Sequence, residues 1–502
     1  MIQQLKAQDA QFLYLQSGGV LTQVMAVFIY DPSTAPGGVV RFEDVVRHVE
    51  SRLDTSPLFR RKLHRLPFDI DHPYWVDDPH FDVEAHISHA ALPEPRDWRQ
   101  LRTMAARHFS KPIDMARPLW DMLVVEGLDH VEGVAPGSFA LFYRIHHAAI
   151  DGVSAMYAFA ALHDQDARGT PAVEAPASAQ DLGEKPDVQT VVSRAWSANL
   201  ASPVKMVEAV MKLSPALVSA AQARLSSPDA EKSSVPQTRF NAPITPHRVF
   251  DAASFALDDL VTIRSLAEGA TINDVVLAIC GGALRRYLDE HGELPESSLV
   301  AYSPINARTS ASEAAVPGNV ITAMAIRLGT DIADHAARLE AIHRFARDAK
   351  EAKAGLSARV ITDLTKAMPG TTLAAVSRLL TSERFAPRQA NTLVSNVPGS
   401  RDQMYLAGAR MTQQFGLGPI AHNMGLFIVA MSYAGTISFS ITSDREMLPD
   451  IDGFRRGLEQ VFAEMREAAR TAPAAKAARR PRTADKPIRH PRTAARTAAG
   501  AR

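Results

Sequence analysis

The stretch "SFALFYRIHHAAIDGV", residues 138–153, decides the fold class of this chain. Its first half is apolar at positions that fall on both faces of an extended chain, as in a central strand of a sheet covered on both sides. Apolar residues after the turn recur at helical spacing. The stretch therefore predicts a strand, a turn and a helix, with His146 and His147 at the end of the strand and Asp151 and Gly152 in the turn.

Strand-like and helix-like patterns alternate on both sides of this stretch, which indicates an α/β protein. Residues 1–163 are expected to form a first lobe and residues 239–470 a second one. The intervening residues 164–238 contain two polar breaks rich in proline and glycine around helical patterns, and we interpret them as a linker with bridging helices. Two such lobes would enclose a cleft, a common place for a ligand.

The expected elements can be quoted from the sequence. The strand-like runs include "VMAVFIY", "WDMLVVEG", "RVFDAASFAL", "SLVAYSP", "NVITAMAIRL" and "MGLFIVAMSYA". The helix-like runs include "RFEDVVRHVESRL", "WRQLRTMAARHF", "INDVVLAICGGALRRYL" and "DGFRRGLEQVFAEMREAA". The size agrees with two domains, because 502 residues of which 46% are hydrophobic can bury one large core or two of medium size.

Charge is distributed unevenly although the formal net charge is zero. Residues 471–502 hold nine Lys or Arg against one acid, a net of +8, so residues 1–470 carry −8. The tail is rich in Ala, Pro, Arg and Thr and lacks aromatic residues, which predicts a disordered, solvated extension. A basic tail can also contact anionic lipid headgroups, and no nucleic-acid partner is expected.

Cys280 is the single cysteine, which excludes an internal disulfide and any metal site built from several cysteines. No apolar run approaches the roughly 18 residues that a membrane-spanning helix needs. The N-terminus lacks the basic and apolar blocks of a secretory signal. We therefore expect a cytoplasmic protein without a transmembrane helix.

The paired histidines allow three interpretations. Histidine suits general-base chemistry because its ordinary pKa of about 6.5 lets it accept and return a proton near neutral pH. A histidine that simply belongs to the core is the plain alternative. A zinc site is the weakest, since no third ligand is evident and adjacent histidines on a strand point to opposite faces. By the same alternation, only one of the two can face a given cleft.

The segment "HHAAIDG" resembles the HHxxxDG signature of the CoA-dependent acyltransferase superfamily, which includes chloramphenicol acetyltransferase and the condensation domains of peptide synthetases. The wider pattern resembles the bacterial wax ester synthase/acyl-CoA:diacylglycerol acyltransferase family. Its shared stretches are "DAQFLYL", "HPYWVDDPHFDVEAHI", "RPLW", "NDVVLAICGGALRRYL", "SPINAR", "GN", "SNVPGS" and "MSYAGTISFSITSDR". The resemblance covers roughly residues 1–468 and excludes the tail.

The resemblance implies two chloramphenicol-acetyltransferase-like lobes with a cleft or tunnel between them. It implies that His147 is the general base, that Asp151 holds the loop, and that His146 packs or hydrogen-bonds behind the active face. It also implies substrate contacts from five residues: Gly152, Asn273, Asp274, Ser395 and Asn396. No metal and no cofactor is implied, because acyl-CoA is a substrate.

The same residues have plainer interpretations. Thr271 and Asp274 fit a capping box at a helix start, so stability alone could explain them. Trp120 of "RPLW" is favoured as a packing anchor, and Cys280 lies on a core stripe of its helix beside two glycines that would allow close packing. The chain also departs from the family, whose members often have a glutamate where this chain has Gln16.

The implied activity is the transfer of a long-chain acyl group from acyl-CoA to diacylglycerol, forming triacylglycerol, with fatty alcohols and wax esters as the close variant. Such substrates dissolve in membranes, so we expect peripheral contact with a membrane or lipid droplet, through residues 204–225 and the basic tail. Two alternatives stay open. One is acyl transfer to a polyketide or peptide hydroxyl, and the other is a lipid-binding protein without catalysis.

Overall fold

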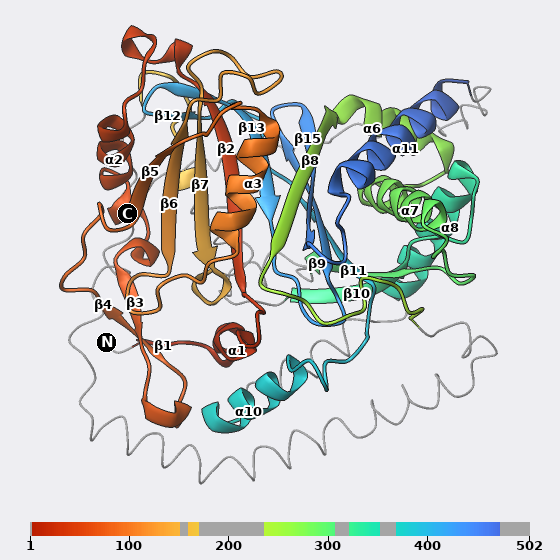
Figure 1. Cartoon of the computed structure of the whole chain (residues 1–502), viewed down its shortest axis with the longest axis horizontal. Helices are drawn as coiled ribbons and strands as arrows, with labels where there is room; N and C mark the ends of the chain where they lie inside the picture. The colour runs from red at the N-terminus through yellow and green to blue at the C-terminus, as the bar shows by residue number, and fades with distance from the viewer. Residues whose placement is uncertain (1–2, 151–158, 170–234, 307–320, 352–367, 472–502) are drawn as a thin grey trace, which may run out of the picture.

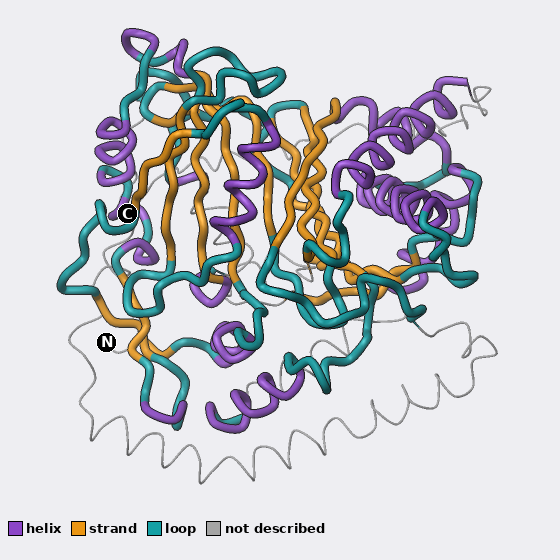
Figure 2. The backbone as a smooth tube through the Cα atoms, viewed as in Figure 1, coloured by secondary structure: helices purple, strands orange, loops and turns teal. Residues whose placement is uncertain are grey.

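The computed structural model describes residues 3–150, 159–169, 235–306, 321–351 and 368–471 (Figure 1). Within these ranges the chain forms two six-stranded sheets and one three-stranded sheet. The two large sheets lie side by side, and helices cover their outer faces (Figures 1 and 2). The expected two-lobed α/β architecture is confirmed, whereas the expected bridging helices and basic tail lie outside the described residues.

The first large sheet carries the stretch that decided the fold class. Its order is β12-β13-β2-β7-β6-β5. The bounds are β2 Gln23–Asp31, β5 Ile87–Ala91, β6 Trp120–Glu126, β7 Phe139–His146, β12 Tyr405–Leu406 and β13 Ala409–Leu417. β7 pairs antiparallel with both β2 and β6, and all eight of its residues are buried. The prediction of a covered central strand is therefore confirmed.

The residues of β2 show why this sheet must be covered on both sides. Alternate side chains enter two different apolar cores. Ala26, Phe28 and Tyr30 pack on the face beside α2 (Phe42–Glu50). Met25, Val27 and Ile29 pack on the opposite face, with α3 (Trp98–Phe109) and β8 (Arg248–Ala256). Because β8 belongs to the other large sheet, this second core joins the two lobes.

One strand crosses from the C-terminal half of the chain into the N-terminal sheet. β13 pairs antiparallel with β2, with Phe415 opposite Val27, and β12 extends the sheet further. Without β13, the apolar strand β2 would be an open edge, which proteins avoid because unpaired backbone groups recruit other strands. The sequence patterns did not indicate this exchange, and the division into residues 1–163 and 239–470 stays a prediction.

The second large sheet has the order β10-β9-β11-β14-β15-β8. Its remaining strands are β9 Val300–Asn306, β10 Ile321–Arg327, β11 Thr392–Val397, β14 Leu426–Tyr433 and β15 Thr436–Asp444. Its helices are α6 Leu257–Ile263, α7 Ile272–Glu290, α8 His335–Glu351 and α11 Ile451–Thr471. The helix α7 packs between α8 and α11 (Figure 1).

The expected packing of α7 is confirmed. Cys280 is fully buried, and burial raises the pKa of its thiol well above the ordinary value, so it is an inert core residue. A Cβ atom at Gly281 would meet the carbonyl oxygen of Leu328, and one at Gly282 would lie 2.6 Å from Val461. The two glycines therefore let neighbouring segments approach the helix closely, as the sequence predicted.

A smaller unit lies below the first sheet in the view of Figure 1. It contains the sheet β1-β4-β3 and the helices α1 and α10, which contact each other. The bounds are β1 Gln3–Gln4, β3 Arg61–His64, β4 Tyr74–Asp77, α1 Ala7–Leu15 and α10 Gly370–Leu380. Nearby, Trp120 is buried against Phe59 and donates its indole N–H to the Phe59 carbonyl at 3.0 Å, so its expected role as a packing anchor is confirmed.

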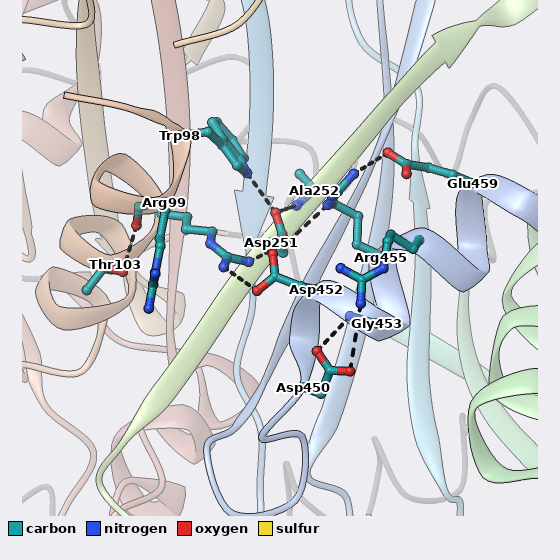
Figure 3. A network of polar contacts seen from close by, with 12 residues as sticks. Trp98, Arg99, Thr103, Asp251, Ala252, Asp450, Asp452, Gly453, Arg455 and Glu459 are labelled. Carbon is teal, nitrogen blue, oxygen red and sulfur yellow. Dashed lines mark hydrogen bonds and ion pairs between the residues drawn. The ribbon is translucent and has the colours of Figure 1, made fainter. Parts of the chain in front are cut away.

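A buried polar network holds the two lobes together (Figure 3). The carboxylate of Asp251 on β8 has no solvent exposure. It accepts a hydrogen bond from the Trp98 indole at 2.7 Å and pairs with Arg102, both on α3. Arg455 of α11 approaches the same carboxylate at 3.2 Å, and Arg102 also binds Asp452 of α11 at 2.6 Å. Three elements from both lobes thus meet at one carboxylate.

Replacing Asp251 with alanine should lower the free energy of unfolding by about 3–5 kcal/mol, because the buried Arg102 and the partly exposed Arg455 would lose a shared carboxylate and the Trp98 indole its acceptor. Glu459→Ala is the matched control, since it removes the outer, partly exposed partner of Arg455 and should cost at most about 1 kcal/mol. Urea unfolding of both variants measures the difference. Equal losses in the two variants would contradict the role assigned to Asp251.

Candidate active site

The histidine motif lies where the central strand β7 ends. His146 is the last residue of β7, and His147–Ala149 form a 3₁₀ turn, η6. The amide of His146 donates to the carbonyl of Leu119 at 2.9 Å, and the amide of His147 donates to the carbonyl of Thr22 at 2.9 Å. The turn is therefore held from both sides. Its continuation, with Asp151 and Gly152, lies outside the described residues.

His146 is fully buried and both of its ring nitrogens are engaged. Nδ1 accepts the backbone amide of Ala148 at 3.1 Å, which places the proton on Nε2. Nε2 then donates to the side-chain oxygen of Gln16 at 2.9 Å, with the Thr22 hydroxyl at 3.3 Å. Burial and, to a lesser degree, neighbouring basic groups lower the pKa of His146 to about 3. His146 is a neutral ring that caps the 3₁₀ turn.

His147 begins the turn, and its ring stacks on Phe12 of α1 with the centroids 3.9 Å apart and the planes at 17°. Its Nδ1 is buried and makes no hydrogen bond to the residues that the structure describes. Burial lowers the pKa of His147 to about 4, against a smaller opposing contribution from its own backbone. The imidazole is thus neutral at neutral pH.

Several separated sequence stretches meet around this turn. Ala148 and Ala149 pack in an apolar cluster with side chains from "DAQFLYL", from "HPYW" and from "RPLW". The other members of this cluster are Leu5, Ala7, Ala10, Phe12, Leu13, Tyr14, Leu63, Trp75, Met115, Leu119, Met368, Leu373 and Ala374. The last three come from α10 and from the position two residues before it, a segment to which the sequence had assigned no role.

The Asn273–Asp274 pair lies at the start of α7, in the helical layer of the second lobe. The carboxylate of Asp274 accepts the amide of Thr271 at 2.8 Å, and the Thr271 hydroxyl accepts the amide of Asp274 at 3.3 Å, so the predicted capping box is confirmed. His343 of α8 also contacts this carboxylate at 2.9 Å. Asn273 is half-buried. Within the described chain, no hydrogen bond or ion pair joins either residue to His147.

Ser395 and Asn396 lie on β11, an inner strand of the second sheet, and both are half-buried. They stand in register with Val429 and Ala430 of the parallel neighbour β14. In the following turn, a Cβ at Gly399 would meet the carbonyl oxygen of Ser432, so only glycine fits. In the described residues no hydrogen bond joins these side chains to the histidine turn.

The geometry leaves little scope for the two histidines to bind zinc. A structural zinc site needs four ligands and a catalytic one usually three. Both ring nitrogens of His146 are already used, by Ala148 and Gln16. Among the described residues, no group of three or more His, Cys, Asp or Glu side chains is placed to hold a metal ion.

Three contacts of the turn were not anticipated from the sequence. Phe12 stacks on His147, while Gln16 and Thr22 hold the ring of His146. Phe12 lies in a stretch shared with the family but carries no chemistry of its own. The sequence feature that could have indicated the His146 contact is Gln16, where family members often have a glutamate. The neutral side-chain oxygen of Gln16 accepts a hydrogen bond from the neutral ring of His146.

Comparison with protein families matches nearly the whole chain. Residues 5–276 match the wax ester synthase/diacylglycerol acyltransferase catalytic domain. Residues 317–466 match the C-terminal domain of the same family. A Mycobacterium tuberculosis protein named as a diacylglycerol O-acyltransferase is 32% identical over 471 residues, which cover 93% of this chain and 90% of that protein.

Solved structures support the same grouping. The wax ester synthase/diacylglycerol acyltransferase from Marinobacter aquaeolei superposes with a TM-score of 0.65 at 25% identity, covering 93% of this chain and 99% of that one. The starter condensation domain of rhizomide synthetase superposes with a TM-score of 0.52 at 12% identity, covering 94% and 96% of the two chains. This second likeness concerns the fold alone.

The lowered pKa of His146 predicts a measurable dependence of stability on pH. The folded state holds the ring neutral while the unfolded chain protonates it near pH 6.5, so stability is lost as the pH falls below that value. Between about pH 7 and pH 5 this group alone should cost about 2 kcal/mol.

His146→Asn removes the titrating group, so its free energy of unfolding should decline less steeply over the same interval than that of the wild type. Urea unfolding at several pH values measures the two slopes. The replacement itself lowers stability at every pH, and therefore the slope is the informative quantity. Parallel slopes for wild type and variant would refute a neutral, buried His146.

Proposed function

The chain belongs to the wax ester synthase/diacylglycerol acyltransferase family, and from that premise we propose that it moves a long-chain acyl group from acyl-CoA to the hydroxyl of a diacylglycerol. The products are triacylglycerol and free CoA. Fatty alcohols are a second class of acceptor and give wax esters. Diacylglycerol acyltransferase is the activity that the names of the family, of the relative and of the solved neighbour share.

The observation that carries the proposal is the neutral imidazole of His147 at the end of the central strand. A general base must be unprotonated at the working pH and close to the proton that it accepts. Stacking on Phe12 orients the ring with Nδ1 buried, and we assign Nε2 to the acceptor.

The proposed step uses no covalent acyl-enzyme. The acceptor O–H transfers its proton to Nε2 of His147 while its oxygen forms a bond to the thioester carbonyl carbon. The carbon–sulfur bond of the tetrahedral intermediate then breaks. The departing CoA thiolate takes the proton back from His147, so the base is regenerated and atoms and charges balance.

The remaining site residues are proposed in supporting roles. Asp151 and Gly152 shape the loop after the turn, and Asn273, Ser395 and Asn396 contact substrate from the second lobe across the cleft between the lobes. The carboxylate of Asp274 is already hydrogen-bonded to Thr271 and His343. We therefore propose that Asp274 fixes the start of α7 and so positions Asn273.

We further propose that the protein works at the cytoplasmic surface of a membrane or lipid droplet, because its acceptors reside there. In the described ranges there is no helix with the length and apolar character to cross a bilayer. A peripheral mode of contact agrees with that finding.

Replacing His147 with alanine should lower acyl transfer by on the order of 10² to 10⁴, the usual contribution of a general base. The measurement is CoA release from palmitoyl-CoA with dioleoylglycerol, with hexadecanol, or without acceptor. His80→Ala, which removes an exposed histidine, is the matched control and should retain full activity.

Release that requires an acceptor and disappears only in His147→Ala is the expected result, and the better acceptor identifies the preferred product. Equal inactivity of folded wild type and variant with both acceptors would disprove the proposed transfer.

The pKa of His147 also predicts the pH dependence of the reaction. With a pKa of about 4, the base stays more than about 90% neutral at pH 5.5, whereas an ordinary histidine would be about 90% protonated there. The acid limb of kcat/KM should therefore lie near pH 4.

The assay is CoA release across the acid range, with samples returned to neutral pH to confirm that activity is recovered. A reversible acid limb centred near pH 6.5 would show that His147 is not held neutral by its surroundings.

A further inference from the structure

The exposed large apolar side chains of this protein are concentrated in one short segment. Among the described residues, six such side chains are exposed: Val39, Val261, Val376, Leu379, Leu380 and Phe385. Four of the six fall within the ten residues 376–385, on α10 and the turn after it. Scattered apolar residues need no explanation, but a group of this kind marks an interaction surface.

The helix α10, which carries these exposed side chains, is packed against the rest of the protein on its inner side. Leu373, Ala374 and Ser377 are buried on its inner side, against α1 and the apolar cluster of the histidine turn. A Cβ at Gly370 would lie 2.8 Å from the carbonyl oxygen of Asp69, so the start of the helix is tightly packed. The helix is therefore already folded and anchored, and its outer apolar residues are not exposed by fraying.

Val376, Leu379 and Leu380 follow the spacing i, i+3 and i+4, which places them on one outer stripe of α10. Figure 1 shows α10 at the lower edge of the molecule, beside α1. An outer stripe on a peripheral helix can meet a flat partner without any rearrangement of the fold.

The charges around this stripe are mainly positive. Arg378 and Arg384 are exposed; Arg378 also pairs with the Asp69 carboxylate at 2.8 Å, and the guanidinium of Arg384 lies over the ring of Phe385 at 5.7 Å. Glu383 is the single acid between residues 376 and 388. An apolar stripe bordered by arginine complements an anionic lipid surface, where acyl chains meet the apolar side chains and headgroups meet the cations.

The stripe is also close to the chemistry. Leu373 and Ala374 of α10 belong to the same apolar cluster as Ala148, the residue after His147, and as Phe12, which stacks on the His147 ring. A surface held by α10 would therefore lie one helix away from the base. An acceptor dissolved in that surface would reach the site by a short path.

We propose that Val376, Leu379, Leu380 and Phe385, with Arg378 and Arg384, form a docking surface for anionic lipid, named here the α10 patch. The inference rests on the proposed function, since it explains how a lipid-borne acceptor is delivered, and it names a place for the contact. It adds α10 to the lipid contacts expected of residues 204–225 and of the basic tail.

A fluorescent reporter tests the α10 patch in the full-length protein. Cys280 is fully buried with a raised thiol pKa, so Leu380→Cys provides a single reactive thiol for an environment-sensitive nitrobenzoxadiazole label. Addition of phosphatidylcholine–phosphatidylglycerol vesicles should shift its emission to shorter wavelength. Val39→Cys with the same label is the control, because Val39 is 61% exposed against 47% for Leu380 but lies outside the patch.

The emission should shift at position 380 and stay constant at position 39. Adding Leu379→Ser and Phe385→Ser to the labelled Leu380→Cys protein should raise the lipid concentration for half-maximal shift by about tenfold or more. Unchanged emission at position 380, or an equal shift at position 39, would overturn the proposal. The reporter needs no acyl-CoA, so loss of acyl transfer with intact docking counts against the proposed function alone.

Discussion

The buried carboxylate of Asp251 is the constraint on which the arrangement of the two lobes depends. A charge without solvent contact is tolerated only where donors surround it, and here they come from α3 and α11 on either side of β8. The surrounding apolar core, which includes Met25 and Phe415, fills the same joint. The carboxylate network and this core therefore join the lobes at the same place, one through directional polar contacts and the other through apolar packing.

Within that arrangement, the same burial that builds the histidine turn also prepares its chemistry. Stacking against Phe12 and packing around Ala148 remove water from the ring of His147, and loss of water disfavours the protonated form. His146 is neutral for the same reason, but both of its nitrogens are occupied. Both histidines thus have a pKa lowered by burial, but they differ in their hydrogen bonds. His146 ends the strand and has both ring nitrogens bonded, whereas His147 begins the turn and has an unbonded Nδ1.

Much of the fold was predictable because its signals are local. The apolar run of β7 indicated a central strand, Thr271 and Asp274 indicated a cap, and the glycines after Cys280 indicated close packing, all from residues near one another in sequence. The insertion of β13 beside β2 was not predictable in this way. It pairs residues almost 400 positions apart, and their alternation would suit either sheet.

The sequence by itself indicated which residues are chemically capable. The resemblance of the motif implied that His147 is the base, whereas no pattern distinguished Asp251 from the other aspartates. The tertiary structure alone decided their states, since a pKa, a hydrogen bond to Gln16 or an exposed stripe on α10 depends on which distant segments arrive beside a residue. Side-chain type is a local property, whereas desolvation and contact are properties of the assembled chain. That difference explains why the site's residues were visible in the sequence and its surroundings were not.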